Sequence, residues 1–169
     1  MSHPAEEDVW DAACENKALP VQARVSLKGN RKQYDGARAT LKRQTGLDFA
    51  FEFDPVAWLD LIKAKNEHPG PNELVNRLGE MLGGHCLTIS THLGDYCANR
   101  GKYNKDIVDE MLCARKIVLL PTDTPVSAPT HATMQVKDGA LVVQISVAMW
   151  ISVDDDVGYH ALVSLLGGS

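Results

Sequence analysis

Residues 130–153, "THATMQVKDGALVVQISVAMWISV", constrain the fold more than any other stretch of the sequence. Asp138-Gly139 separates two runs in which apolar and polar residues alternate, a pattern typical of two strands joined by a type I′ turn. With these two residues in the turn, the register sorts apolar from polar side chains. The apolar pairs are then Val136 with Leu141, Met134 with Val143 and Ala132 with Ile145; the opposite face pairs Gln135 with Val142, Thr133 with Gln144 and His131 with Ser146.

The second strand of this hairpin is unusually long. Every odd position from Leu141 to Val153 is apolar, so the hairpin is predicted to cover about 131–153. Strands average about five or six residues, and the far half of this one therefore needs another partner. Trp150 lies on its more polar face. An aromatic side chain there is expected to be covered by a helix or by another protein chain, and contact with a second copy or a peptide is one hypothesis.

The rest of the chain alternates between helical and strand-like periodicity. Helices are predicted where apolar residues recur every three or four positions between caps such as Asp54-Pro55 and Gly46. They cover about 4–18, 31–45, 55–65, 72–82, 105–114 and 154–168, and strands cover 20–29, 47–54 and 116–121. The strand at 20–29 is predicted because Val21, Ala23, Val25 and Leu27 alternate with polar residues.

The resulting fold class is α+β, with a mostly antiparallel sheet, helices packed on one face and the other face partly open. The C-terminal hairpin is followed by a closing helix. Apolar residues make up 44% of the chain and charged residues 23%, as in ordinary globular proteins. No repeat or linker divides the sequence, so residues 1–169 are expected to form a single domain.

A cytoplasmic location is expected from the N-terminal sequence, the lack of a long apolar run and the spacing of the cysteines. The N-terminal "MSHPAEEDVW" lacks the basic start and apolar core of a signal peptide, and no apolar run is long enough for a membrane span. Four cysteines without CxxC spacing favour reduced thiols.

The most reactive-looking stretch is "GGHCLTISTHLGDYC", residues 83–97. Its periodicity fits a strand or a helix, and the β-branched Thr88, Ile89 and Thr91 favour a strand slightly. On a strand, Cys86 and His92 would lie roughly 20 Å apart, and on a helix His85 and His92 would be about 10 Å apart. Neither spacing gathers ligands around one ion, so no metal is expected. A thiol nucleophile, Cys86 with His85 or His92 as base, stays an alternative to core packing.

Other motifs of cofactor chemistry are absent from the sequence. No GxxxxGK[ST], GxGxxG after a strand or GxSxG occurs, and Asp154, Asp155 and Asp156 lack the spacing of a calcium loop. These three aspartates are better explained as the start of the closing helix. The sequence therefore predicts no cofactor and does not favour an enzyme.

A basic segment covers residues 24–43, although the net charge of the chain is −5. On a helix from 31 to 45, Arg31, Arg38 and Lys42 share one face, and Arg24 and Lys28 share the polar face of the strand before it. These five residues form a candidate patch for phosphate, nucleic acid or an acidic partner. The alternative is a solvated face balanced by nearby acids.

The first hypothesis is a small intracellular protein that binds a protein partner or a second copy of itself, using the open sheet face, the proline-rich loop near 121–130 and the basic segment. Trp150 is a further candidate contact for a second copy or a peptide. An enzyme with a site assembled from distant residues is the second, with Cys86, His85 and His92 as candidates. A phosphate or nucleic-acid site on the basic segment is the third. No membrane association is expected.

Overall fold

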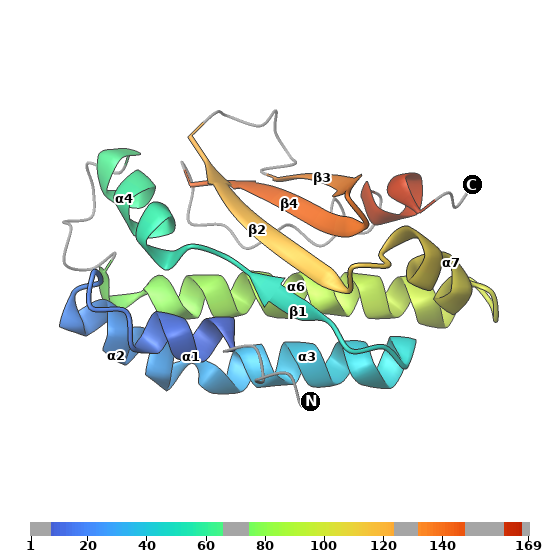
Figure 1. Ribbon diagram of the computed structural model, residues 1–169, viewed down its shortest axis with the longest axis horizontal. Coiled ribbons are helices and arrows are strands. Elements are labelled where there is room, and N and C mark those ends of the chain that lie inside the picture. Colours follow the sequence, from blue (N-terminus) through green and yellow to red (C-terminus); the bar gives the residue numbers. More distant parts are fainter. Residues whose placement is uncertain (1–7, 66–74, 124–131, 148–160, 167–169) are drawn as a thin grey trace, which may run out of the picture.

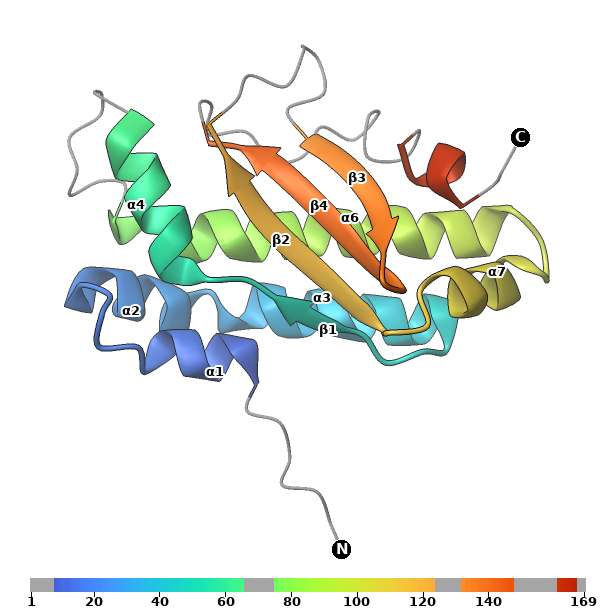
Figure 2. The ribbon, with the colours of Figure 1, turned by 45° about the horizontal axis from the view of Figure 1, so that its top comes forward.

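The computed structural model describes residues 8–65, 75–123, 132–147 and 161–166. A four-stranded sheet lies over two long helices that run side by side (Figures 1 and 2). The strands are β1 (Ala50–Glu52), β2 (Lys116–Thr122), β3 (Ala132–Lys137) and β4 (Ala140–Ser146). The helices are α1 (Val9–Cys14), α2 (Val21–Gly29), α3 (Arg31–Thr45), α4 (Pro55–Lys65), α6 (Leu78–Asn99) and α7 (Asn104–Met111), and residues 161–165 are also helical.

The α+β class is confirmed, but the sheet is mixed and not mostly antiparallel. Its strand order is β1-β2-β4-β3. β1 pairs with β2 in parallel and β2 pairs with β4 in parallel, whereas only β3 and β4 are antiparallel. The sequence did not predict the parallel pairs, because alternation within the hairpin fixes how β3 pairs with β4 but not which other strand lies beside β4.

The hairpin has the predicted register. Ala132 pairs with Ile145, Met134 with Val143 and Val136 with Leu141. Asp138 and Gly139 have φ values of 53° and 74°, as both central residues of a type I′ turn require. β4 ends at Ser146, and the predictions for His131, Trp150 and the strand beyond 147 lie outside the described residues.

Residues 21–29 are a helix that follows Pro20 as its N-cap, so the strand predicted at 20–29 is wrong. The alternating residues split into two helical pairs, because side chains two positions apart on a helix diverge by about 200°. Ala23 and Leu27 are 0% exposed, whereas Val21 and Val25 are each 61% exposed on the opposite side.

Residues 85–97 belong to α6, and the preference for a strand there is also wrong. Small residues explain the helix, because they let α6 lie close against α2 and α3. A Cβ on Gly79 would lie 2.2 Å from the Ser26 carbonyl oxygen, and one on Gly94 would lie 3.1 Å from the Gln44 side chain. The contact at Gly79 leaves no space for a methyl group, because the nearest atoms are main-chain atoms of α2, whereas the contact at Gly94 is close but is made by a side chain.

The core lies between the sheet and the helices. The inward side chains of β2 and β4 are at most 1% exposed: Ile117, Leu119, Leu141, Val143 and Ile145. Trp10 of α1 stacks on Tyr34 of α3 with ring centroids 5.0 Å apart, and its indole N–H donates to the Leu27 carbonyl. Trp58 of α4 donates to the Leu119 carbonyl at 3.3 Å, which fixes α4 to β2.

Candidate functional site

The three residues considered for catalysis belong to α6 and are buried in the core of the protein. His85 is 2% exposed, Cys86 is 0% exposed and His92 is 6% exposed. Consecutive side chains on a helix diverge by about 100°, so His85 and Cys86 point to different faces. Burial lowers the pKa of His85 to about 4 and raises the pKa of the Cys86 thiol. At neutral pH these shifts favour an uncharged imidazole and an uncharged thiol, which suits packing and not nucleophilic attack.

Thiol labelling checks this placement directly. Cys113 is exposed, Cys97 is intermediate, and Cys14 and Cys86 are buried. We expect one fast equivalent with Ellman's reagent under native conditions at pH 8, lost in Cys113→Ser, and the other thiols to react fully only after unfolding. Fast labelling of Cys86 in the native chain would contradict its burial and favour the thiol-enzyme hypothesis.

The basic segment lies against acidic residues of α1 and α3. Arg31 forms ion pairs with Asp8, Asp11 and Asp35. The other three pairs are Arg38 with Asp8 at 3.2 Å, Lys42 with Asp48 at 2.9 Å and Lys28 with Glu15 at 3.6 Å. The Nε of the fifth residue, Arg24, is buried and has no hydrogen-bond partner among the described residues. A phosphate would compete with these carboxylates, so the geometry gives less support to an anion site than the sequence did.

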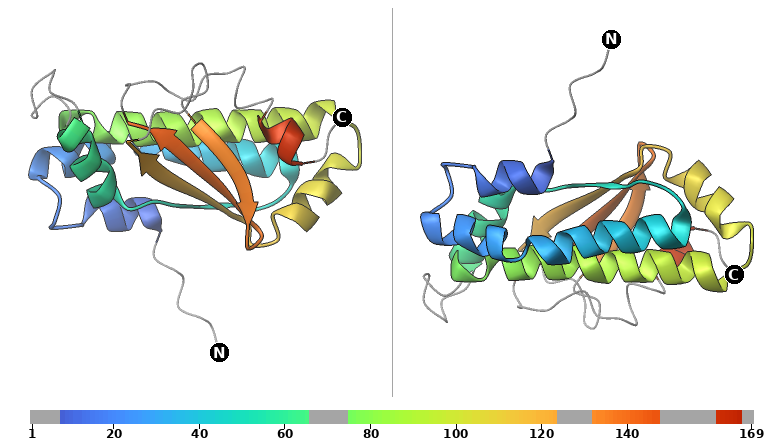
Figure 3. Two further views of the ribbon diagram at one scale, coloured as in Figure 1. Left: turned by 90° about the horizontal axis from the view of Figure 1, so that it is seen from above. Right: turned by 90° about the horizontal axis from the view of Figure 1, so that it is seen from below.

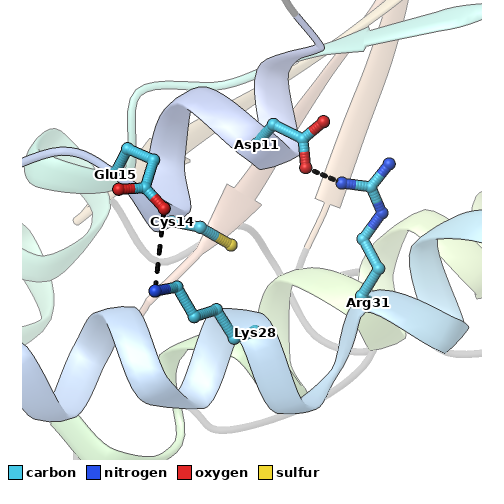
Figure 4. Close-up of a pocket in the computed structure, with 5 residues that line it drawn as sticks. All are labelled: Asp11, Cys14, Glu15, Lys28 and Arg31. Atoms are coloured by element: carbon cyan, nitrogen blue, oxygen red, sulfur yellow. Dashed lines mark hydrogen bonds and ion pairs between the residues drawn. The ribbon is translucent and has the colours of Figure 1, made fainter.

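Two of these ion pairs border a cleft of about 600 Å³ between α1 and the α2–α3 pair (Figure 4). Asp11 and Glu15 come from one side and Lys28 and Arg31 from the other, with the Cys14 thiol between them. Burial and the nearby Asp11 raise the pKa of Cys14. The thiol is therefore a poor nucleophile at neutral pH.

No group of three or more metal-ligating side chains gathers anywhere in the described part of the chain. None of the helices in the same ranges has the length and hydrophobicity to cross a bilayer.

The sheet surface that faces away from α3 and α6 is called the outer face here. No described helix or strand lies over β2, β3 and β4 on this side (Figure 3, left). Strand alternation places thirteen side chains on it: Ala50, Glu52, Lys116, Val118, Leu120, Thr122, Thr133, Gln135, Lys137, Ala140, Val142, Gln144 and Ser146. Thr122 and Ser146, which pair with each other at one end of this face, are buried.

The centre of the outer face is uncharged on β2, β4 and β3 and contains three apolar side chains, Val118, Leu120 and Val142, beside polar ones. Val118 lies opposite Val142 in the β2–β4 pairing, and Leu120 lies opposite Gln144. Leu120 is 42% exposed, although it belongs to a strand at the middle of the sheet. The strand predicted at 116–121 gave no reason to single out Leu120, because Ile117, Val118, Leu119 and Leu120 are all apolar and the sequence does not mark which of them face outwards.

Comparison of the chain with protein-family models, curated proteins and solved structures found no match. The function is therefore inferred from this chain's own geometry.

Proposed function

We propose that this protein works by binding another protein through the outer face, and that the partner is a second copy of the chain. The exposed Leu120 at the centre of that face supports the proposal most directly. Contiguous apolar surface on a sheet is costly in water and is typical of contact surfaces between proteins. The free thiols of all four cysteines suit a reducing compartment, and we propose the cytoplasm.

The distribution of charge favours a second copy as the partner. Lys116 and Lys137 lie in one row across the sheet, at the turn end of the hairpin. The next two rows contain Val118, Val142 and Gln135, and then Leu120, Gln144 and Thr133. Apart from Glu52 at the β1 edge, these two rows are uncharged. A surface with a neutral centre and lysines at one end can pack on itself without bringing like charges together.

One two-fold arrangement satisfies this condition. If the axis runs across the strands between the Val118 row and the Leu120 row, each Leu120 lies over Val118 of the other copy. The two lysine rows then lie at opposite ends of the interface. An axis along the strands would instead place lysine row on lysine row, which is repulsive. A contact between two faces of a four-stranded sheet with short strands would be small for a protein interface, so we expect a Kd on the order of 10 μM.

Sedimentation equilibrium of the full chain tests the proposal. The weight-average mass should rise with concentration from 18.5 kDa towards twice that value. Leu120→Lys should keep the chain monomeric, because it buries an unpaired charge at the centre of the interface. Leu87→Lys is the matched control, since Leu87 is a 38% exposed leucine on α6 and not on the outer face.

The control variant should dimerise like the wild type. A monomer at all concentrations up to about fiftyfold above the expected Kd would reject the proposal. Equal loss of association in both leucine variants would also reject it, because the interface would then lie elsewhere.

A further inference from the structure

α2 has apolar side chains on two opposite sides. Ala23 and Leu27 are 0% exposed against the core, whereas Val21 and Val25, one turn apart, are each 61% exposed. A helix at the surface of a globular protein normally has a single apolar stripe, and that stripe faces the core. The second stripe of α2 is therefore available for contact with another molecule.

Two basic residues lie beside these valines. Positions i, i+3, i+4 and i+7 share one side of a helix, which places Arg24 and Lys28 with Val21 and Val25. These four residues are called the α2 face here. α1 and α6 flank α2 (Figure 3, right), and the exposure of both valines shows that neither helix covers the α2 face.

Arg24 is the second observation that indicates a partner. Each of the other four residues of the basic candidate patch pairs with a carboxylate, whereas the guanidinium of Arg24 forms no ion pair with any described residue. Its buried Nε holds the side chain against the protein. Of the guanidinium, only the Nε is buried in this way, so the two Nη groups are accessible to a ligand. A half-buried guanidinium without an acceptor is costly, and a carboxylate of a partner would supply the acceptor.

Lys28 adds a second positive charge to the α2 face. Its pair with Glu15 spans 3.6 Å, and the two side chains are 58% and 72% exposed. An exposed pair of this kind contributes little to stability, so a carboxylate of a partner can replace Glu15 at little cost. The α2 face therefore combines two apolar contacts with two positive charges, and the sequence of α2 contains no acidic residue.

Three classes of partner differ in how well they match the α2 face. A single-stranded nucleic acid would need aromatic side chains for stacking, and Asp11 and Glu15 of α1 lie beside Lys28 and would repel its phosphates. A membrane surface would need more than two apolar side chains to hold the helix. An acidic amphipathic helix has apolar residues four positions apart, at the axial spacing of about 6 Å that also separates Val21 from Val25.

We infer that the α2 face binds an acidic amphipathic helix of another protein. Two apolar side chains of that helix, four positions apart, contact Val21 and Val25. A carboxylate beside them accepts hydrogen bonds from the Nη groups of Arg24, and a second carboxylate pairs with Lys28. None of the four residues belongs to the outer face, so the inference does not depend on the proposed dimer.

Selection of a phage-displayed library of randomised helical peptides on the immobilised full chain provides the probe. The peptides have about eighteen residues, because shorter isolated helices are marginal in water. We expect the enriched sequences to contain acidic residues beside apolar residues four positions apart. The most enriched peptide is synthesised with a fluorescein label, and its Kd is measured by anisotropy. Arg24→Met and Val25→Asp should each weaken binding about tenfold.

Arg43→Met and Leu87→Asp are the matched controls, because Arg43 is an exposed arginine on α3 and Leu87 is a 38% exposed leucine on α6. Both controls should bind the peptide with the wild-type Kd, as should Leu120→Lys. Val25→Asp should still dimerise, so the inference and the proposed function fail separately. Arg24→Met should keep or raise the urea midpoint, because it removes a half-buried charge that has no described partner.

The inference is overturned if no peptide is enriched, or if the enriched peptides lack acidic residues. It is equally overturned if Arg24→Met and Val25→Asp bind the peptide as tightly as the wild type. A lower urea midpoint for Arg24→Met would assign the guanidinium to the fold and not to a partner. Binding of the full chain to phosphatidylserine vesicles that both variants abolish would replace the partner helix with a membrane surface.

Discussion

Replacing Gly79 by alanine is expected to destabilise the fold by about 3 kcal/mol, because the new methyl group has no space. Its Cβ would lie 2.2 Å from the Ser26 carbonyl oxygen, 2.4 Å from the Ser26 carbonyl carbon and 2.7 Å from the Leu27 nitrogen. These are main-chain atoms of α2, which cannot rotate away as a side chain would. α6 must therefore move from α2, and the Gly79 N–H then loses its 2.9 Å hydrogen bond to the Ser26 hydroxyl.

Gly84→Ala is the matched control on the same helix. Outside the neighbouring turns of α6 itself, no atom of the described residues lies within 4 Å of a Cβ at that position. Alanine there should stabilise the chain by about 0.5 to 1 kcal/mol, because it lowers the backbone entropy of the unfolded state. Urea unfolding at equilibrium gives both free energies. Two changes of the same sign and size would show that α6 does not pack on α2 in this register.

The second large effect is a loss of stability in mild acid that depends on His85. Burial lowers the pKa of His85 from its ordinary 6.5 to about 4 in the folded chain. The unfolded chain takes up this proton below pH 6.5, whereas the folded chain does so only near pH 4. The contribution is therefore fully present above pH 6.5 and is lost as the pH falls towards 4. By pH 5 the loss is about 2 kcal/mol relative to pH 7.5.

His85→Leu isolates this contribution, since leucine has a similar volume and cannot titrate. The Trp58 ring lies 5.7 Å from the imidazole and would still be covered by the new side chain. Measured by urea midpoints between pH 7.5 and 5, the wild type should lose about 2 kcal/mol more than the variant. The difference between the two pH slopes is the readout, so a constant offset in stability does not affect it. Parallel slopes would mean that His85 is reached by water in the folded state.

The sequence was most informative where one local signal had a single structural solution. Asp138-Gly139 can occupy a two-residue turn with positive φ at both positions, and the register of the hairpin follows from it. Asp54 before Pro55 similarly predicted the start of α4, where the Asp54 carboxylate accepts the Val56 N–H at 3.0 Å.

The sequence was misleading where one pattern fits two periodicities. Alternation over four apolar residues also describes two helical pairs, and only the packing of Ala23 and Leu27 against the rest of the core decides between them. Thr88, Ile89 and Thr91 favour strands on propensity, but Gly79 and Gly94 place the same segment on a helix that contacts α2 and α3. Tertiary contacts of this kind outweigh propensities of a fraction of a kcal/mol per residue.

The candidate site was the least predictable part of the molecule. Asp8 and Asp11 precede the basic segment in the chain, and only the docking of α1 on α3 brings them to Arg31 and Arg38. The position of β1 at the edge of the sheet depends on the strand order, which local patterns do not encode. The exposure of Leu120 can be recognised only when β2 is known to lie inside a sheet that no described helix or strand covers on its outer face.

The position of β4 has a consequence for how the protein forms during synthesis. β4 lies between β2 and β3 in the sheet, although it follows both in the chain. A nascent chain that ends before residue 140 consequently lacks the middle of its sheet, and both long edges that β4 will occupy are unpaired. Until those residues leave the ribosome, β2 has an exposed edge of unpaired main-chain groups that can pair with another chain. A pause in translation before residue 140 is therefore expected to increase aggregation of the nascent chain.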